Sequence, residues 1–276
     1  MRQSKSIELK SWRSVLGATT IAIAFVTILV GGLYAMTVEG NNQEGSLPNI
    51  VLVHGAWADG SSWSGVILSL QEAGYDVTAV QNPLTSLADD VARTRQVLAE
   101  QDGPTILVGH SYGGAVITQL GTDAPNVVAL VYVAAFGPAE GETLQGLISQ
   151  GPGLPEGLPQ PDQQGFVWLD RGGFVQYFAP DVEPVSQARV LAAVQKPIAG
   201  TILGETIGEP SWQTLPSWYL VAEEDQIIPP DAQHFMAQRM GANISSVEAS
   251  HVAMISRPET VAHLIEQVAQ TVEAED

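Results

Sequence analysis

The chain has no cysteine among its 276 residues. Disulfide bridges and thiolate metal sites are therefore excluded. Basic side chains are also scarce, since 11 lysines and arginines stand against 30 acidic residues and give a net charge of −19. This acidity argues against nucleic acid or an anionic lipid surface as a partner, and it disfavours anionic substrates. The sequence has no His/Asp/Glu cluster with metal-ligand spacing, no phosphate-binding glycine loop and no internal repeat. We expect neither a metal nor a cofactor.

The N-terminal segment combines a basic start with a long apolar run. Residues 1–14 carry four basic side chains and one acidic side chain, whereas residues 15–38 carry no charge. The run is long enough to span a bilayer, and its basic flank should remain in the cytoplasm. Residues 1–38 are therefore predicted to be a cleaved signal peptide or a membrane anchor, and both alternatives imply export to the periplasm or the outside. Residues 39–48 are expected to form a linker. Because residues 1–38 carry +3, the remaining residues carry −22.

Residues 49–276 are predicted to form one α/β domain. Apolar strand-like runs alternate with helical patterns, which favours a mostly parallel, doubly wound sheet. Glycine and proline become frequent from about residue 137 to residue 216. This segment is expected to be a cap inserted over the active site. Strands are expected at residues 49–53, 75–80, 105–108, 127–133, 218–222 and 244–248, and helices at residues 64–73, 86–101, 115–120 and 258–272.

The most informative motif is Gly109-His110-Ser111-Tyr112-Gly113, which matches the pattern G-x-S-x-G. It follows a short apolar strand and precedes a helical run, which is the setting of a nucleophile elbow. A serine on so sharp a turn holds a strained backbone, and the flanking glycines avoid clashes with the neighbouring strand and helix. The motif therefore predicts that Ser111 is a nucleophile.

A serine hydroxyl needs a base to remove its proton and an acid to orient that base. Of the five histidines, His251 is the one that follows a strand and precedes the last helix, so we predict that it is the base. The acid is expected between the serine and the histidine in chain order. Asp225, at the end of an apolar strand, is our candidate, and the adjacent Glu223 and Glu224 are alternatives.

An oxyanion hole is expected beside Ser111. One donor should be the backbone N–H of Tyr112, which follows the nucleophile, and the other should come from the loop after the first strand, at Ala56 or Trp57. Gly55 would let the backbone approach the substrate closely. We expect His54 to brace this loop by hydrogen bonds rather than to transfer protons.

Four stretches, at residues 51–57, 109–114, 225–229 and 250–251, together resemble small α/β-hydrolases of the hydroxynitrile lyase and plant methylesterase type and their bacterial esterase-like relatives. The resemblance implies the α/β-hydrolase fold with a cap insertion. The lyase branch has a lysine after its catalytic histidine, whereas this chain has Val252. That difference argues against cyanogenesis, and a serine nucleophile argues against epoxide hydrolase and dehalogenase chemistry.

The predicted activity is cofactor-free hydrolysis of a small or medium, mostly uncharged carboxylic ester by an exported serine hydrolase. A lactonase or amidase, or a cofactor-free perhydrolase of the haloperoxidase-like kind, would use the same triad. A ligand-binding protein that keeps the triad is an alternative of another class. Four cap aromatics are expected to line an apolar pocket or, alternatively, to form the cap's own core: Trp168, Phe174, Tyr177 and Phe178.

Overall fold

The computed structural model describes residues 47–120 and 124–275. The predicted signal peptide or anchor, and nearly all of the predicted linker, lie outside these ranges. Within them, no helix combines the length and the apolar character that crossing a membrane would require.

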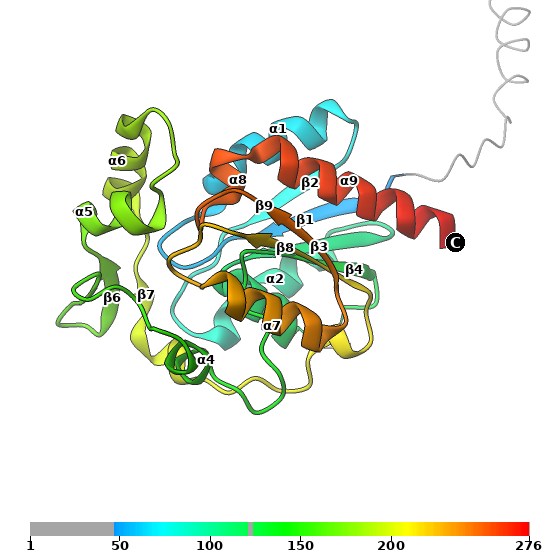
Figure 1. The fold of residues 1–276 in the computed structure, drawn as a ribbon. Helices are drawn as coiled ribbons and strands as arrows, with labels where there is room; N and C mark the ends of the chain where they lie inside the picture. Colours follow the sequence, from blue (N-terminus) through cyan, green and yellow to red (C-terminus); the bar gives the residue numbers. More distant parts are fainter. Residues whose placement is uncertain (1–46, 121–123, 276) are drawn as a thin grey trace, which may run out of the picture. The chain divides into compact units, whose positions relative to one another are not determined.

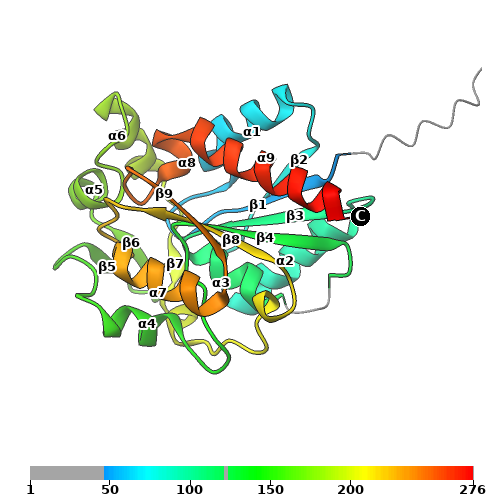
Figure 2. The ribbon, with the colours of Figure 1, turned by 45° about the vertical axis from the view of Figure 1, so that its right-hand side comes forward.

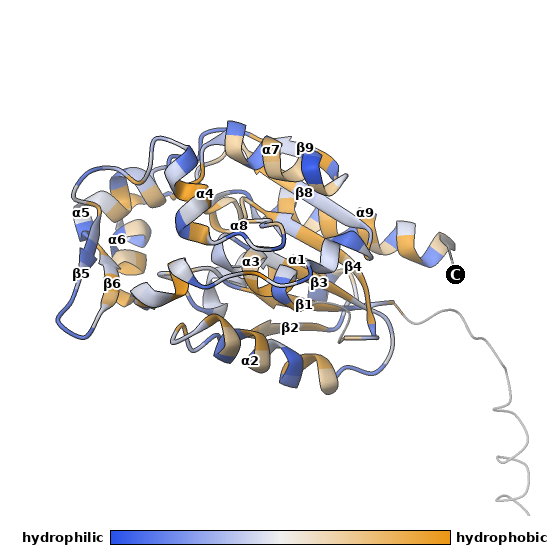
Figure 3. Ribbon diagram, turned by 90° about the horizontal axis from the view of Figure 1, so that it is seen from below, coloured by the Kyte–Doolittle hydropathy of each residue, from blue (hydrophilic) through white to orange (hydrophobic). Residues whose placement is uncertain are grey.

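A six-stranded sheet forms the centre of the domain, in the order β2-β1-β3-β4-β8-β9, and all neighbouring strands are parallel. The central strands are buried along almost their whole length, and Figure 3 shows them as mainly apolar. Burial on both faces is expected for parallel strands that are covered by helices. The strands are β1 (Asn49–Val53), β2 (Val77–Val80), β3 (Thr105–His110), β4 (Val127–Val133), β8 (Ser217–Ala222) and β9 (Asn243–Val247).

Helices cover both faces of this sheet (Figures 1 and 2). On one face lie α1 (Ser64–Glu72), which follows the short η1 (Gly60–Trp63), and α9 (Pro258–Glu275), which follows the short α8 (Ala253–Ser256). The other face carries α2 (Leu87–Ala99), α3 (Tyr112–Gln119) and α7 (Pro230–Met240). These layers confirm the predicted doubly wound α/β architecture. Each predicted strand and helix of the core is present, with ends that shift by a few residues.

The segment between β4 and β8 forms a separate layer at one side of the sheet (Figure 1). It is more regular than its glycine and proline content indicates, because three short strands pair in the antiparallel order β5-β6-β7. Its elements are α4 (Leu144–Gln150), β5 (Pro159–Pro161), β6 (Phe166–Leu169), α5 (Arg171–Gly173), η2 (Phe174–Phe178), α6 (Val185–Val194), β7 (Ile198–Ala199), η3 (Gly200–Gly204) and η4 (Ser211–Gln213). We call residues 137–216 the cap.

Close packing at the start of α3 explains the glycines of the elbow. A β-carbon on Gly113 would lie 2.3 Å from the carbonyl oxygen of Val53, and one on Gly109 would lie 2.7 Å from the carbonyl oxygen of Gly113. Backbone atoms cannot yield as a flexible side chain can. The two glycines therefore let α3 start directly against β1 and β3, and this fixes the position of Ser111.

Candidate active site

Ser111 lies at the turn between β3 and α3. Its backbone has a φ of 53° and a ψ of −122°, a conformation that is uncommon for any residue except glycine. The carbonyl oxygen of Ser111 accepts hydrogen bonds from the N–H groups of Gly114 and Phe136, both at 3.0 Å. These contacts hold the strained turn.

His251 lies in the loop between β9 and α8 and is fully buried. Its Nε2 accepts from the hydroxyl of Ser111 at 2.9 Å, and its Nδ1–H donates to Oδ2 of Asp225 at 2.7 Å. Both contacts are consistent with one neutral tautomer, with the proton on Nδ1. The structure thus brings together the three side chains that the sequence places in a triad.

Asp225 follows β8 and turns its carboxylate inward. Oδ1 accepts from the N–H groups of Ile227 at 2.7 Å and Ile228 at 3.0 Å, while Oδ2 accepts from the side-chain amide of Gln233 at 2.8 Å as well as from His251. The alternative acids Glu223 and Glu224 are both exposed. Among these three adjacent acids, Asp225 is the one that contacts His251.

Gln233 is a further residue of the site, and no motif in the sequence identifies it. This side chain is fully buried on α7, where it also donates to the carbonyl of Ile228 and accepts from the N–H of Ala222. A sequence signal existed, because Gln233 shares one helical stripe with three buried apolar residues, namely Met236, Ala237 and Met240. A polar residue on such a stripe needs buried partners.

The loop after β1, where the sequence predicts oxyanion donors, passes close to Ser111. A β-carbon on Gly55 would lie 2.7 Å from Cβ of Ser111, so the loop after β1 passes directly alongside the serine. Within residues 47–120 and 124–275, no group accepts a hydrogen bond from the N–H of Ala56, Trp57 or Tyr112. Trp57 has a positive φ of 59°, and its indole donates to the carbonyl of Val167 in β6 at 2.9 Å. The loop is therefore tied to the cap.

Two further buried histidines support the site. His54 donates from Nδ1 to the carbonyl of Gly55 at 2.8 Å and accepts at Nε2 from the N–H of Asn82 at 3.0 Å, so it braces the loop as the sequence analysis expects. Burial lowers the pKa of His54 to about 4. His110 donates from Nε2 to the carbonyl of His251 at 2.8 Å, and burial holds its pKa well below the ordinary value of 6.5. Both rings are neutral at physiological pH.

The cap covers the triad with aromatic rings. Phe178 is buried with its ring centroid 5.0 Å from that of His251, and Phe174 packs against Phe178 at 4.6 Å. Together with Trp57 they line a cavity of about 20 Å³, which has room for roughly one water molecule. Tyr177 is half-buried and does not line this cavity. Trp168 is 37% exposed on β6, and its indole donates to Asp162. Of the four predicted cap aromatics, the structure places Phe174 and Phe178 over the triad.

Ser111 is only 3% exposed and His251 is fully buried, so the cap and the surrounding loops shield both side chains from solvent. Within the described ranges, no group of three histidine or carboxylate side chains is placed to hold a metal ion.

Known proteins share this fold. A model of the alpha/beta hydrolase family matches residues 50–264. The pyrethroid hydrolase of Sphingobium wenxiniae is 29% identical over 253 residues, which cover 80% of this chain and 87% of that protein. Putative methylesterase 19 of Arabidopsis thaliana is 25% identical over 258 residues, which cover 78% of this chain and 94% of that protein. The crystal structure of a pyrethroid hydrolase from Sphingobium faniae aligns with a TM-score of 0.70 at 25% identity and covers 81% of this chain and 97% of that one.

These similarities confirm the resemblance to methylesterases and bacterial esterase-type enzymes. They extend along nearly the whole of the described structure, and the family model includes the elbow, the acid loop and the histidine loop. The chain belongs to the alpha/beta hydrolase family.

Proposed function

We propose that this protein is a serine hydrolase that cleaves small or medium, mostly uncharged carboxylic esters. The observation that carries the proposal is the continuous line of hydrogen bonds from Ser111 through His251 to Asp225, with lengths of 2.9 Å and 2.7 Å. A neutral imidazole in this geometry is ready to accept the serine proton. The names of the relatives, a pyrethroid hydrolase and a methylesterase, support ester chemistry.

The reaction proceeds in two halves. Oγ of Ser111 attacks the ester carbonyl while Nε2 of His251 takes the hydroxyl proton, and the backbone N–H groups of Tyr112 and of Ala56 or Trp57 stabilise the oxyanion. His251 then protonates the leaving alcohol, which leaves an acyl group on Ser111. Water attacks this acyl-enzyme, His251 removes the water proton, and the acid departs as the proton returns to Ser111. Asp225 stays ionised and stabilises the imidazolium that forms in each half.

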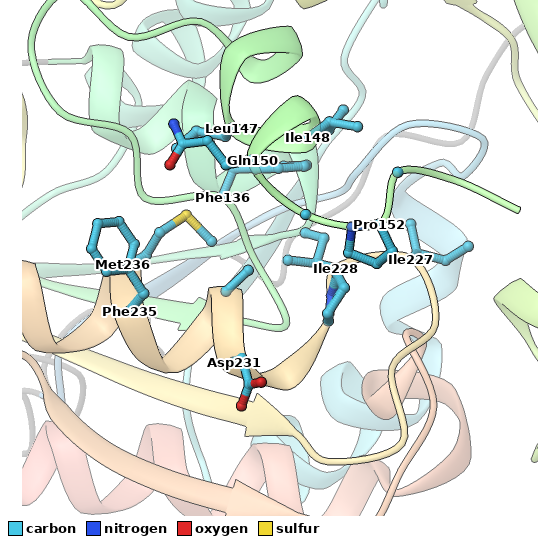
Figure 4. A pocket seen from close by; sticks show the side chains of 14 residues that line it. Phe136, Leu147, Ile148, Gln150, Pro152, Ile227, Ile228, Asp231, Phe235 and Met236 are labelled. Atoms are coloured by element: carbon cyan, nitrogen blue, oxygen red, sulfur yellow. The ribbon is translucent and has the colours of Figure 1, made fainter.

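A larger cavity next to the triad supports the choice of substrate. It has a volume of about 370 Å³ and lies between α4 and α7 (Figure 4). Its wall includes the side chains of Phe136, Ile227 and Ile228, whose backbone N–H groups hold Ser111 and Asp225. The volume lies within the range of small-molecule pockets, roughly 300–1,000 Å³. We infer that the apolar part of the ester occupies this cavity, and the carboxylate of Asp231 at its edge disfavours an anionic group there.

The test treats the full-length protein with a fluorophosphonate and with a series of short and medium chromogenic esters. Ser111→Ala should abolish both labelling and turnover. Ser149→Ala, which removes an exposed hydroxyl on α4, should change neither. Ester turnover that survives in folded Ser111→Ala would show that another group is the nucleophile. A folded wild-type protein that the fluorophosphonate does not label would contradict the proposal.

We also propose that the domain is exported. The support is the basic and apolar pattern of residues 1–38, which lie outside the described residues. Protease added to intact cells should digest the hydrolase domain of an anchored protein, and a secreted protein should appear in the periplasm or the medium. A domain that is digested only after cell lysis, and that remains with the cytoplasmic fraction, would contradict export.

A further inference from the structure

The loop that carries His251 is held at three consecutive residues by three different parts of the molecule. The carbonyl of Ala249 accepts from the N–H of Glu224, in the loop of the acid, at 3.0 Å. The carbonyl of His251 accepts from His110, in the elbow, at 2.8 Å. Between them, Ser250 is held by the cap. The cap therefore contacts the main chain at the residue before His251, in addition to covering the imidazole ring.

The contact with the cap is made by Asp181, which lies between η2 and α6. Oδ2 of Asp181 accepts from the backbone N–H of Ser250 at 3.0 Å, and Oδ1 accepts from the Ser250 hydroxyl. Ser250 is fully buried, so water cannot replace this acceptor while the cap is closed. Burial raises the pKa of Asp181, but hydrogen bonds, chiefly those from Ser250, outweigh burial and hold the pKa below its ordinary value of 3.8. The carboxylate is thus ionised at neutral pH, which strengthens both bonds.

Asp181 lies only three residues after Phe178, whose ring covers His251 at a centroid distance of 5.0 Å. A short piece of cap therefore makes both contacts with the histidine loop, one with the imidazole and one with the residue before it. A movement of this piece that uncovers the triad also withdraws the acceptor of Ser250.

We propose that Asp181 is a positioning residue that aligns His251 through Ser250 and couples this alignment to closure of the cap. In the closed state the Asp181 carboxylate fixes the backbone at Ser250 and so sets the orientation of the imidazole ring of His251. When the cap opens for substrate, the loop keeps its anchors at Ala249 and His251 but loses the middle one. His251 is therefore fully aligned with Ser111 only when a substrate is bound and the cap has closed over it. This role rests on the proposed ester hydrolysis.

Three variants of the full-length protein test the proposal. Asp181→Asn places an amide donor opposite one of the two Ser250 donors, and Ser250→Ala removes only the hydroxyl bond. Glu183→Gln is the matched control, because it removes a carboxylate two residues away that is exposed and makes no hydrogen bond to the described residues. For each variant, kcat per fluorophosphonate-titrated site and KM are measured with one chromogenic ester. A second readout is the downfield proton resonance of His251 Nδ1–H, which requires no turnover.

Asp181→Asn should lower kcat by about 10- to 100-fold with little change in KM, because misplacement of a catalytic group affects the chemical step. Ser250→Ala should lower kcat less, and the double variant should resemble Asp181→Asn because both changes break the same contact. The His251 resonance should shift or broaden in these variants and stay unchanged in Glu183→Gln.

A kcat per titrated site within twofold of wild type, together with an unchanged resonance, would overturn the proposal and leave Asp181 a purely structural residue. If Asp181→Asn does not fold, Ser250→Ala decides by the same criteria. If wild type shows no ester turnover, the proposed function fails separately, and the His251 resonance alone decides whether Asp181 positions the base.

Discussion

Tyr112 donates its hydroxyl to the carboxylate of Asp90 at 2.5 Å, so the residue that directly follows Ser111 is anchored to α2. Asp90 is fully buried, and its other oxygen accepts from the N–H of Leu84 at 2.8 Å. The carbonyl of Leu84 in turn accepts from Ala199 of the cap at 2.9 Å. Asp90 therefore joins the elbow, α2 and a loop that contacts the cap. Burial raises the pKa of Asp90 to about 6, although the bonds from Tyr112 and Leu84 lower it.

The raised pKa of Asp90 predicts how the stability of the Asp90→Asn variant, relative to wild type, depends on pH. Because the folded protein holds this proton more tightly than the unfolded chain, ionisation of Asp90 opposes folding progressively between pH 4 and pH 6. Asparagine is not ionised, so the free energy of unfolding of the variant should rise relative to wild type over this range, by at most about 1.4 kcal/mol per pH unit. Urea denaturation at pH 4.5 and pH 7.5 measures the difference, and an equal difference at both values would contradict the prediction.

The buried neutral histidines predict the opposite trend for the wild-type protein. His54 and His110 have folded pKa values below the ordinary 6.5, so the unfolded chain takes up their protons first as the pH falls. The stability that they contribute is complete above about pH 6.5 and is lost toward pH 4. Two histidines outweigh the single carboxyl of Asp90, so the free energy of unfolding should be smaller at pH 5 than at pH 7.5.

His54→Gln isolates one part of this pH dependence. Glutamine can accept from the N–H of Asn82 but does not titrate, so the loss of stability between pH 7.5 and pH 5 should shrink by about 2 kcal/mol. His263→Gln changes an exposed histidine on α9 and should leave the loss unchanged. A loss that is the same in His54→Gln and wild type would show that His54 is not held neutral.

The sequence was sufficient to place the triad because the decisive signals are local. The elbow needs Gly109 and Gly113 within a few residues of Ser111, and their packing requirements appear directly in the motif. The acid was less certain, since Glu223 and Glu224 adjoin Asp225. The deciding feature is a turn in which the Asp225 carboxylate accepts from the N–H two residues later, at 2.7 Å. Aspartate forms this turn readily because its side chain is short.

The residues that the sequence did not reveal act across long separations. Asp90 meets Tyr112 across 22 residues, and Asp181 meets Ser250 across 69. Such contacts depend on how the elements dock, which propensity and periodicity do not report. The cap aromatics show the same limit. Phe174 and Phe178 are four residues apart and share one helical face, whereas Trp168 lies on a short strand where neighbouring side chains alternate in direction.

Gln233 should support catalysis by orienting Asp225. Gln233→Leu removes the donor to Oδ2 of Asp225 and leaves the N–H of Ala222 without its acceptor. We expect the free energy of unfolding to fall by about 2–4 kcal/mol and kcat to fall by about tenfold. Gln238→Leu, on the exposed side of the same helix, should change neither. Steady-state kinetics and thermal denaturation measure both effects, and a stable variant with wild-type kcat would contradict the role.

Phe178 should limit access to the triad. Its ring lies against His251, with Trp57 at 6.0 Å and Phe174 at 4.6 Å, so Phe178→Ala opens space directly above the base. The truncation should lower the free energy of unfolding by about 3–5 kcal/mol. Among the folded molecules, kcat/KM for esters with a bulky aryl group on the acid should rise relative to kcat/KM for the acetates of the same alcohol. The ratio of the two kcat/KM values measures access independently of the amount of folded protein.

Phe235→Ala provides the matched comparison for Phe178→Ala, because Phe235 is 51% exposed on α7 and lines the larger cavity instead of the space above His251. If Phe178 guards the entrance, the ratio of bulky to small substrates should rise more in Phe178→Ala than in Phe235→Ala, which only enlarges the cavity proposed to hold the apolar part of the ester. A rise in Phe235→Ala alone would place the entrance between α4 and α7. Phe178 would then serve only to pack the cap against His251, and substrates would reach Ser111 without displacing its ring.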